Sequence, residues 1–194
     1  MRPPFMNTRE QLDSLDGQQY LVLRPTSDVA DCYVEEQTRA LELRELPHPH
    51  TGHVTLRGFY EPTRRDDLAA LVRAWASTQQ PIEIIADAVD VFPEPWQIVI
   101  LRLARTRALV TAYTSLTEIL DATDFRRLGE LSVDEWTFHM SVVYGKTLAR
   151  EDWQAIEAAR VREFQHSVSE VVSDVELVSY VGGKEHREII RLGH

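Results

Sequence analysis

The sequence contains a single cysteine, Cys32, among 194 residues, so no internal disulfide can form. A chain without disulfides is typical of a reducing compartment. Residues 1–7 also lack the apolar core of a secretory signal peptide. These two absences predict a cytoplasmic protein.

The sequence also lacks an excess of positive charge and a long hydrophobic run. Lys and Arg number 21 against 31 for Asp and Glu, a net charge of −10. This balance argues against a broad, sequence-independent grip on nucleic-acid phosphates, although a small basic pocket stays compatible with it. The most apolar stretch, residues 97–104, is interrupted by Arg102 and is far shorter than the roughly 20 residues that span a bilayer. We therefore expect no membrane insertion.

What the sequence does contain is an ordinary globular composition, with 43% hydrophobic residues, 8 glycines and 9 prolines. Periodicity and proline breaks predict the order β-α-β-α-β in each half of the chain. The expected strands are 20–24, 53–60 and 82–92, then 96–101, 137–144, 171–180 and 186–192. The expected helices are 28–45, 65–80, 105–120 and 150–165.

This repeated order predicts an internally duplicated α+β fold. We expect one bilobal domain over residues 1–194, with pseudo-repeats at about 18–92 and 95–193. The two lobes should carry antiparallel-rich sheets around a central cleft. Nothing in the sequence requires an oligomer, so we expect a monomer.

Two segments within predicted strands share the pattern histidine, apolar, hydroxyl, apolar. They are His53-Val54-Thr55-Leu56 and His139-Met140-Ser141-Val142. Because side chains at i and i+2 of a strand share a face, each histidine should lie beside its hydroxyl. One such triplet could be a half-buried histidine bonded to a neighbouring hydroxyl, but matching positions in both halves favour a functional pair.

Two imidazoles and two hydroxyls suit the chemistry of a phosphodiester. Imidazole serves as general acid or general base near neutral pH. A hydroxyl donates to non-bridging oxygens as negative charge develops on them. We predict four catalytic residues, with the acid and base roles open between the histidines: His53, His139, Thr55 and Ser141.

The two motifs, their separation and the duplicated layout resemble the two-histidine (2H) phosphoesterase superfamily, which includes bacterial 2′,5′ RNA ligases and cyclic nucleotide phosphodiesterases of tRNA splicing. The resemblance runs from about Tyr20 to the end of the chain and is specific in the two motifs and the element order. It implies an enzyme that hydrolyses or forms 2′,3′-cyclic or 2′,5′ phosphodiester bonds without a metal or cofactor. Its partner would be a nucleotide or RNA end, and the acidic net charge favours small or short substrates.

Three further residues are candidates for substrate binding. The resemblance implies this role for Tyr144. Strand alternation, however, places Tyr144 on the face opposite His139 unless the strand bulges. A core position for Tyr144 is therefore the alternative. Arg57 and Phe59 share the alternation of His53, so we expect them to face the cleft. There Arg57 would bind phosphate and Phe59 would stack on a base. A solvated strand end for Arg57 and a core position for Phe59 are the alternatives.

Two other functions compete with the enzyme. A cleft of this kind could bind a nucleotide or RNA end without reacting, but two acid/base groups favour catalysis. His48, His50 and His53 form a short array that could be mistaken for a metal site. Prolines mark that segment as a loop, and no carboxylate or thiol motif completes the array, so we expect no metal there.

Overall fold

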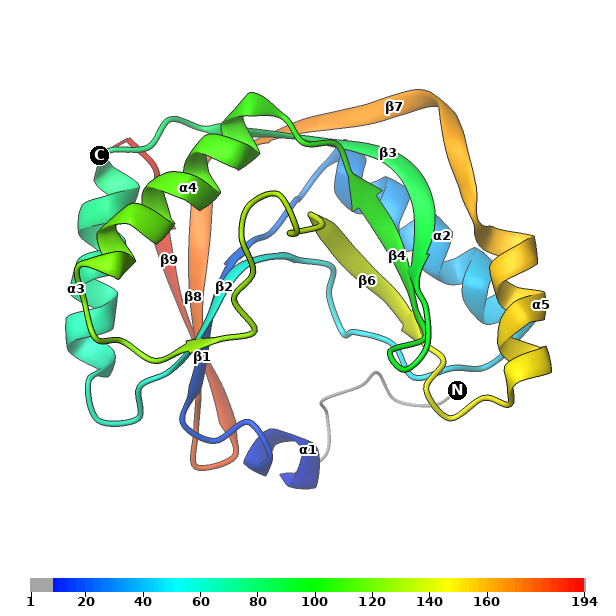
Figure 1. Cartoon of the computed structure of the whole chain (residues 1–194), viewed down its shortest axis with the longest axis horizontal. Coiled ribbons are helices and arrows are strands. Elements are labelled where there is room, and N and C mark those ends of the chain that lie inside the picture. Colours follow the sequence, from blue (N-terminus) through cyan, green and yellow to red (C-terminus); the bar gives the residue numbers. More distant parts are fainter. Residues whose placement is uncertain (1–8, 194) are drawn as a thin grey trace.

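The computed structural model describes residues 9–193, which form two antiparallel sheets with helices on their outer sides (Figure 1). The first sheet has the order β5 (Arg127–Leu128), β2 (Val54–Tyr60), β1 (Gln18–Leu23), β8 (Asp174–Val181) and β9 (Lys184–Arg191). The second has the order β6 (His139–Tyr144), β4 (Ile98–Leu103), β3 (Ile82–Phe92) and β7 (Arg162–Val172). The predicted α+β fold with antiparallel sheets in two lobes is confirmed. The leaderless N-terminus predicted at residues 1–7 lies outside the described range.

The helices cover the outer faces of the two sheets. They are α1 (Arg9–Asp13), α2 (Asp28–Leu43), α3 (Arg65–Ser77), α4 (Arg107–Asp121) and α5 (Arg150–Arg160). Helix α3 packs on β8 and β9, whereas α2 packs on β3, β6 and β7 and α5 packs on β3. In Figure 1, α3 and α4 lie beside each other and α2 and α5 lie on the opposite side, while α4 also packs on β3 of the second sheet. None of the helices in the described range is long and apolar enough to cross a membrane.

Each sheet combines strands from both halves of the sequence. Strand β3 belongs to the first half of the chain but pairs with β4 and β7 in the second sheet. Strands β8 and β9, at the end of the chain, return to the first sheet beside β1. The two lobes are therefore tied together by crossing strands, and the pseudo-repeat bounds stay a prediction.

Amphipathic periodicity explains the clearest helix. In α4 the residues Leu109, Ala112, Leu116 and Leu120 recur at helical spacing and are buried. Thr106 begins this helix as its N-cap, because its hydroxyl accepts a hydrogen bond from the Leu109 backbone at 3.1 Å. Local sequence is enough to specify such an element.

The predicted helix at 150–165 is too long, and the strand that follows it was missed. Helix α5 ends at Arg160, and β7 begins at Arg162. Most of β7 is polar and only Glu170 and Val172 are buried, so its apolar alternation is weak. Its pairing with β3 stabilises it as an edge strand, which local periodicity cannot reveal.

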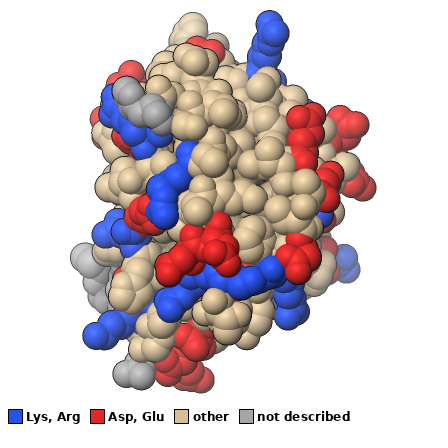
Figure 2. Space-filling view, turned by 90° about the vertical axis from the view of Figure 1, so that its left-hand side faces the viewer, with Lys and Arg blue, Asp and Glu red and all other residues tan. Residues whose placement is uncertain are grey.

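Charge of both signs is mixed on the face of the molecule that carries α3. Seen from the side of α3, blue and red side chains are interspersed among neutral ones (Figure 2). The ion pair Arg73–Glu188, with its atoms 2.7 Å apart, joins α3 to β9. On this face, charged side chains of both signs are mixed and no broad basic patch is seen.

Candidate active site

A bulge in β2 decides which of its side chains reach the cleft. Leu21 of β1 pairs with Arg57 and Val22 pairs with Thr55, so Leu56 is an extra residue without a partner. An extra residue reverses the alternation of the strand beyond it. Thr55 is partly exposed, whereas Arg57 and Phe59 are buried in the core at 1% and 0% exposure. The prediction that these two residues face the cleft is therefore wrong.

Arg57 instead ties β2 to helix α4. Its guanidinium donates to the hydroxyls of Tyr113 at 3.0 Å and Thr117 at 2.6 Å. It also lies over the Tyr113 ring, 4.3 Å from the centroid, and pairs with Glu130 at 3.0 Å. A buried cation with these partners serves packing and charge compensation rather than phosphate binding.

A second bulge, in β6, has the opposite consequence for Tyr144. Val99 pairs with Val143 and Ile100 pairs with Ser141, which leaves Val142 as the extra residue. Tyr144 is thereby turned to the face of Ser141, with which its side chain is hydrogen-bonded. It lines the main pocket of the molecule. The structure thus brings Tyr144 to the cleft, as the resemblance implied and simple alternation did not.

Helix α2 holds the β6 bulge in place. The Tyr33 hydroxyl donates to the Ser141 carbonyl at 3.0 Å, and the Gln37 amide donates to the Val142 carbonyl at 3.1 Å. These bonds satisfy backbone groups at the irregular point of an edge strand. Tyr33 and Gln37 gave no recognisable pattern in the sequence, because they act across more than 100 positions of the chain.

The two histidines are oriented in the same way. His53 Nδ1 lies 3.2 Å from the Thr51 carbonyl oxygen, and His139 Nδ1 lies 2.8 Å from the Thr137 carbonyl oxygen. A ring nitrogen facing a carbonyl carries the proton, so the neutral ring keeps its lone pair on Nε2. Each histidine is thus prepared to accept or donate a proton through Nε2. The repeated motif also includes a threonine two positions before each histidine, Thr51 and Thr137.

Burial lowers the pKa of both histidines below the ordinary value of 6.5. The carbonyl bonds from the two threonines oppose this effect. The positive charge of His53 further lowers the pKa of His139, so the two rings interact electrostatically across the lobes. This repulsion favours the state in which only one of the two rings is protonated.

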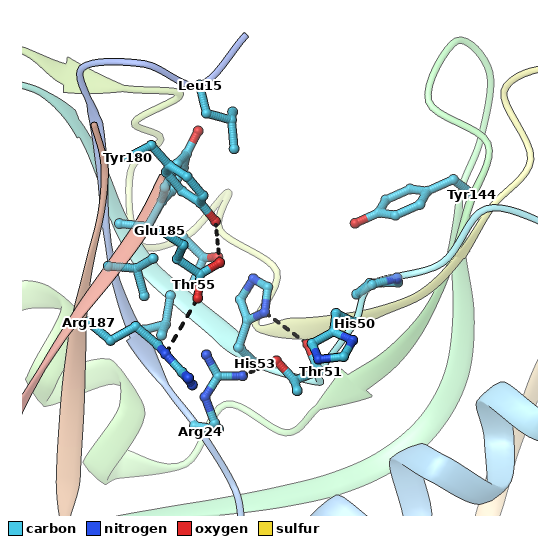
Figure 3. Close-up of a pocket in the computed structure, with 14 residues that line it drawn as sticks. Leu15, Arg24, His50, Thr51, His53, Thr55, Tyr144, Tyr180, Glu185 and Arg187 are labelled. Carbon is cyan, nitrogen blue, oxygen red and sulfur yellow. Dashed lines mark hydrogen bonds and ion pairs between the residues drawn. The ribbon is translucent and has the colours of Figure 1, made fainter. Parts of the chain in front are cut away.

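The main pocket has a volume of about 370 Å³ and lies on the inner face of the first sheet. His53, Thr55 and Tyr144 line it together with His50 (Figure 3). His139 and Ser141 do not line this cavity. They adjoin it, because Ser141 is bonded to Tyr144 and His139 interacts with His53.

His139 contacts an aromatic ring, and an arginine that is already ion-paired is its partner on the neighbouring strand. Its ring meets Phe92 edge to face, with centroids 4.7 Å apart and planes at 89°. Its cross-strand neighbour, Arg102, pairs with Asp87 at 2.9 Å and Glu163 at 2.7 Å. Carboxylates thus compensate the charge of Arg102, which leaves it poorly suited to bind phosphate.

Arg24 was missed by sequence analysis, although it anchors the segment before His53. It pairs with Glu176 at 2.9 Å and donates to the Thr51 hydroxyl and to the Gly52 carbonyl. The same Thr51 supplies the carbonyl that orients His53. Arg24 also lowers the pKa of His53, whereas Glu185 and Glu176 raise it. Arg24 thereby fixes the segment before β2, which lies beyond the last residue pair of β1 and β2, Leu23 and Val54.

The three histidines that could be mistaken for a metal site, His48, His50 and His53, do not gather into one group. His50 lines the pocket near His53, but His48 turns its Nδ1 to the Leu46 carbonyl at 3.0 Å. In the part of the chain that the structure describes, no three or more His, Cys, Asp or Glu side chains are grouped to hold a metal ion.

The sequence of this chain was compared with models of known protein families. The family model of the 2′-5′ RNA ligase superfamily matches residues 30–184. The chain belongs to this superfamily. The resemblance to 2H phosphoesterases drawn from the two motifs is therefore confirmed. A search of curated protein sequences finds no match.

Solved structures agree with the superfamily fold at low sequence identity. The protein TT0787 of Thermus thermophilus superposes with a TM-score of 0.66 at 18% identity, covering 91% of this chain and 98% of its own. E. coli LigT complexed with 3′-AMP gives 0.62 at 12%, covering 90% and 95%. Kluyveromyces marxianus Usb1 gives 0.51 at 10%, covering 90% and 98%. The chain therefore spans nearly the whole of these bilobal proteins.

Proposed function

We propose that this member of the superfamily is a phosphodiesterase that opens 2′,3′-cyclic phosphates on small nucleotides or RNA ends, with His53 and His139 as general acid and base. The observation that carries the proposal is the matched pair of imidazoles. Both direct Nδ1 to a threonine carbonyl and keep Nε2 for proton transfer. A protein that only binds a nucleotide has no need for two such groups.

The reaction needs two proton transfers, and the two-histidine arrangement can supply both without a metal ion. A neutral imidazole accepts a proton from the water that attacks phosphorus. The other imidazole, protonated, donates to the ribose oxygen as its bond to phosphorus breaks, and the product is a phosphate monoester. With a 5′-hydroxyl in place of water, the same two proton transfers would form a 2′,5′ bond and free the ribose 3′-hydroxyl. The two roles exchange when that bond is cleaved back to the cyclic phosphate.

Thr55 and Ser141 would stabilise charge on the non-bridging oxygens. Each lies two residues after its histidine, before the bulge of its strand. Their hydroxyls can therefore donate to a phosphate placed between the rings. Tyr144, bonded to Ser141, would position that hydroxyl and contact the substrate from the second lobe. The E. coli LigT complex with 3′-AMP supports a nucleotide as the ligand class.

The deciding experiment measures turnover by protein kept in EDTA. Substrates are 2′,3′-cyclic AMP, an oligonucleotide with a cyclic phosphate end, and a 2′,5′-linked dinucleotide. We expect hydrolysis of at least one cyclic phosphate, with the double variant His53→Ala/His139→Ala, purified identically, as the control for contaminating enzymes. Binding without turnover would support the nucleotide-binding alternative. Activity lost in EDTA and restored by zinc would contradict the mechanism and favour the histidine array.

A further inference from the structure

The pocket extends well beyond the histidines, along the β8–β9 hairpin. Tyr20, Val178 and Arg187 form one cross-strand row over β1, β8 and β9. Tyr180 and Glu185 form the next row toward the hairpin turn. All five residues line the pocket. In Figure 3, Tyr180 and Glu185 lie at the end away from Thr51, and Arg187 lies between Glu185 and Arg24. A phosphate held between the histidines would leave this end for the rest of the substrate.

Aromatic and apolar side chains make up the walls of this end. The rings of Tyr20 and Tyr180 pack edge to face, with centroids 6.3 Å apart and planes at 77°. Their hydroxyls are occupied, since Tyr20 bonds to Gln18 at 2.5 Å and Tyr180 to Glu185 at 3.2 Å. The fixed rings, with Val178 beside them, offer a surface for a flat ring such as a nucleobase.

The polar groups at this end carry one charge of each sign. Glu185 and Arg187 lie two positions apart on β9, and Arg187 Nε is 3.5 Å from a Glu185 oxygen. Both side chains are substantially exposed, at 40% and 53%, so this ion pair is weak and both groups keep capacity for a ligand. Because the two charges cancel, the pair suits a neutral polar edge better than a second phosphate.

We propose that this end of the pocket is a guanine subsite, read by Glu185 and Arg187. A carboxylate accepts two hydrogen bonds side by side, and among RNA bases only guanine presents two adjacent donors, N1–H and the N2 amine, on one edge. An arginine next to it donates to guanine O6 and N7. Adenine, cytosine and uracil each lack one of these groups. The inference rests on the proposed phosphodiesterase and names its substrate as a guanosine 2′,3′-cyclic phosphate, free or at an RNA end.

The kinetic test compares kcat/KM for the four nucleoside 2′,3′-cyclic monophosphates. We expect the guanosine substrate to exceed the others by about tenfold or more, because one bidentate base contact discriminates by about 1–3 kcal/mol. Glu185→Gln places an amide where acceptors are needed, so it should remove this preference and bring kcat/KM for the guanosine substrate to the level of the other three, all measured at one pH. Arg187→Gln should likewise lower kcat/KM for the guanosine substrate more than kcat/KM for the other three substrates.

Glu188→Gln is the matched control, since it makes the same charge change on the same strand. Glu188 pairs with Arg73 of α3, outside the pocket, and its substitution should change none of the four values. Two results would overturn the guanine assignment. One is an equal kcat/KM for all four substrates in the wild type, and the other is an equal loss of kcat/KM for all four substrates in Glu185→Gln.

A binding measurement separates this inference from the proposed function. Calorimetry with 3′-GMP and 3′-AMP needs no turnover. If the protein turns over no cyclic phosphate, the proposed function fails. The subsite is still supported if 3′-GMP binds more tightly than 3′-AMP and Glu185→Gln abolishes the difference. Equal affinities for the two nucleotides would refute the subsite whatever the kinetics show.

Discussion

Ser141 and Tyr144 share a hydrogen bond on the cleft face of β6, where the bulge at Val142 brings the two side chains together. We expect Tyr144→Phe to lower kcat/KM for a cyclic phosphate by about fivefold to tenfold, the value of one hydrogen bond. Ser141→Ala should cost more, because it removes a donor to phosphate as well. Since the two hydroxyls act as a unit, the double variant should lose less than the sum of the two effects. Strict additivity of the two free energies would contradict this coupling.

The histidine substitutions test the acid/base assignment. His53→Ala and His139→Ala should each lower turnover by about 10²-fold or more, the usual loss when a general acid or base is removed. Circular dichroism should show an unchanged fold. His166→Ala, on an exposed part of β7, is the control and should keep full activity. Retention of activity in either motif variant would exclude that histidine from the chemistry.

The lowered pKa values predict an acidic optimum. Activity needs one protonated and one neutral imidazole, so kcat/KM should be bell-shaped with pH. Burial holds both pKa values below 6.5, so the proton required for the acid is lost at a lower pH than in an exposed pair. The maximum should lie on the acid side of pH 6.5. We would measure kcat/KM from about pH 4.5 to 8.5, and a maximum on the alkaline side of neutrality would contradict the assignment.

Arg24 should act through the position and the pKa of His53. Arg24→Met removes the bonds to Thr51 and Gly52, and it should lower kcat by about tenfold or more with little change in KM, because small displacements of a reacting group are costly. It also removes a charge that lowers the pKa of His53 and leaves Glu185 and Glu176 to raise it. The limb of the pH profile that reports His53 should therefore move to higher pH.

Two control variants distinguish this role from a merely structural one. Arg24→Lys keeps the charge and should leave the pH profile near that of the wild type, while part of the loss in kcat persists. Arg73→Met removes an arginine from the outer face of α3 and should change neither measurement. An unchanged pH profile in Arg24→Met would reduce Arg24 to a structural role.

Arg57 should contribute to stability rather than to substrate binding. Arg57→Met leaves Glu130, Tyr113 and Thr117 without their shared partner. We expect a loss of about 3 kcal/mol in the free energy of unfolding, the lower end for breaking a buried pair, because Glu130 is partly exposed. Urea unfolding measures this loss, and Arg65→Met, exposed in α3, should stay within about 0.5 kcal/mol. A raised KM of Arg57→Met with an unchanged free energy of unfolding would instead indicate that Arg57 binds substrate.

Periodicity predicted most elements of this protein because their stabilising contacts are local. The apolar stripe of α4 and its Thr106 cap lie within one short segment. The motif spacing likewise placed each histidine beside its hydroxyl, since alternation holds over three residues of a regular strand. Strand β7 was missed because its stability comes from pairing with β3, some 80 positions earlier in the chain.

The sequence by itself determined the groups on which the proposed chemistry rests: two imidazoles and two hydroxyls in repeated motifs, and the order of elements that carries them. Tertiary structure decided which neighbouring side chains reach that chemistry. Single-residue bulges at Leu56 and Val142 turned Arg57 into the core and Tyr144 into the cleft. Their positions depend on hydrogen-bond register with partner strands and, in β6, on contacts from α2. Register is a property of paired segments, so it cannot be read from either segment alone.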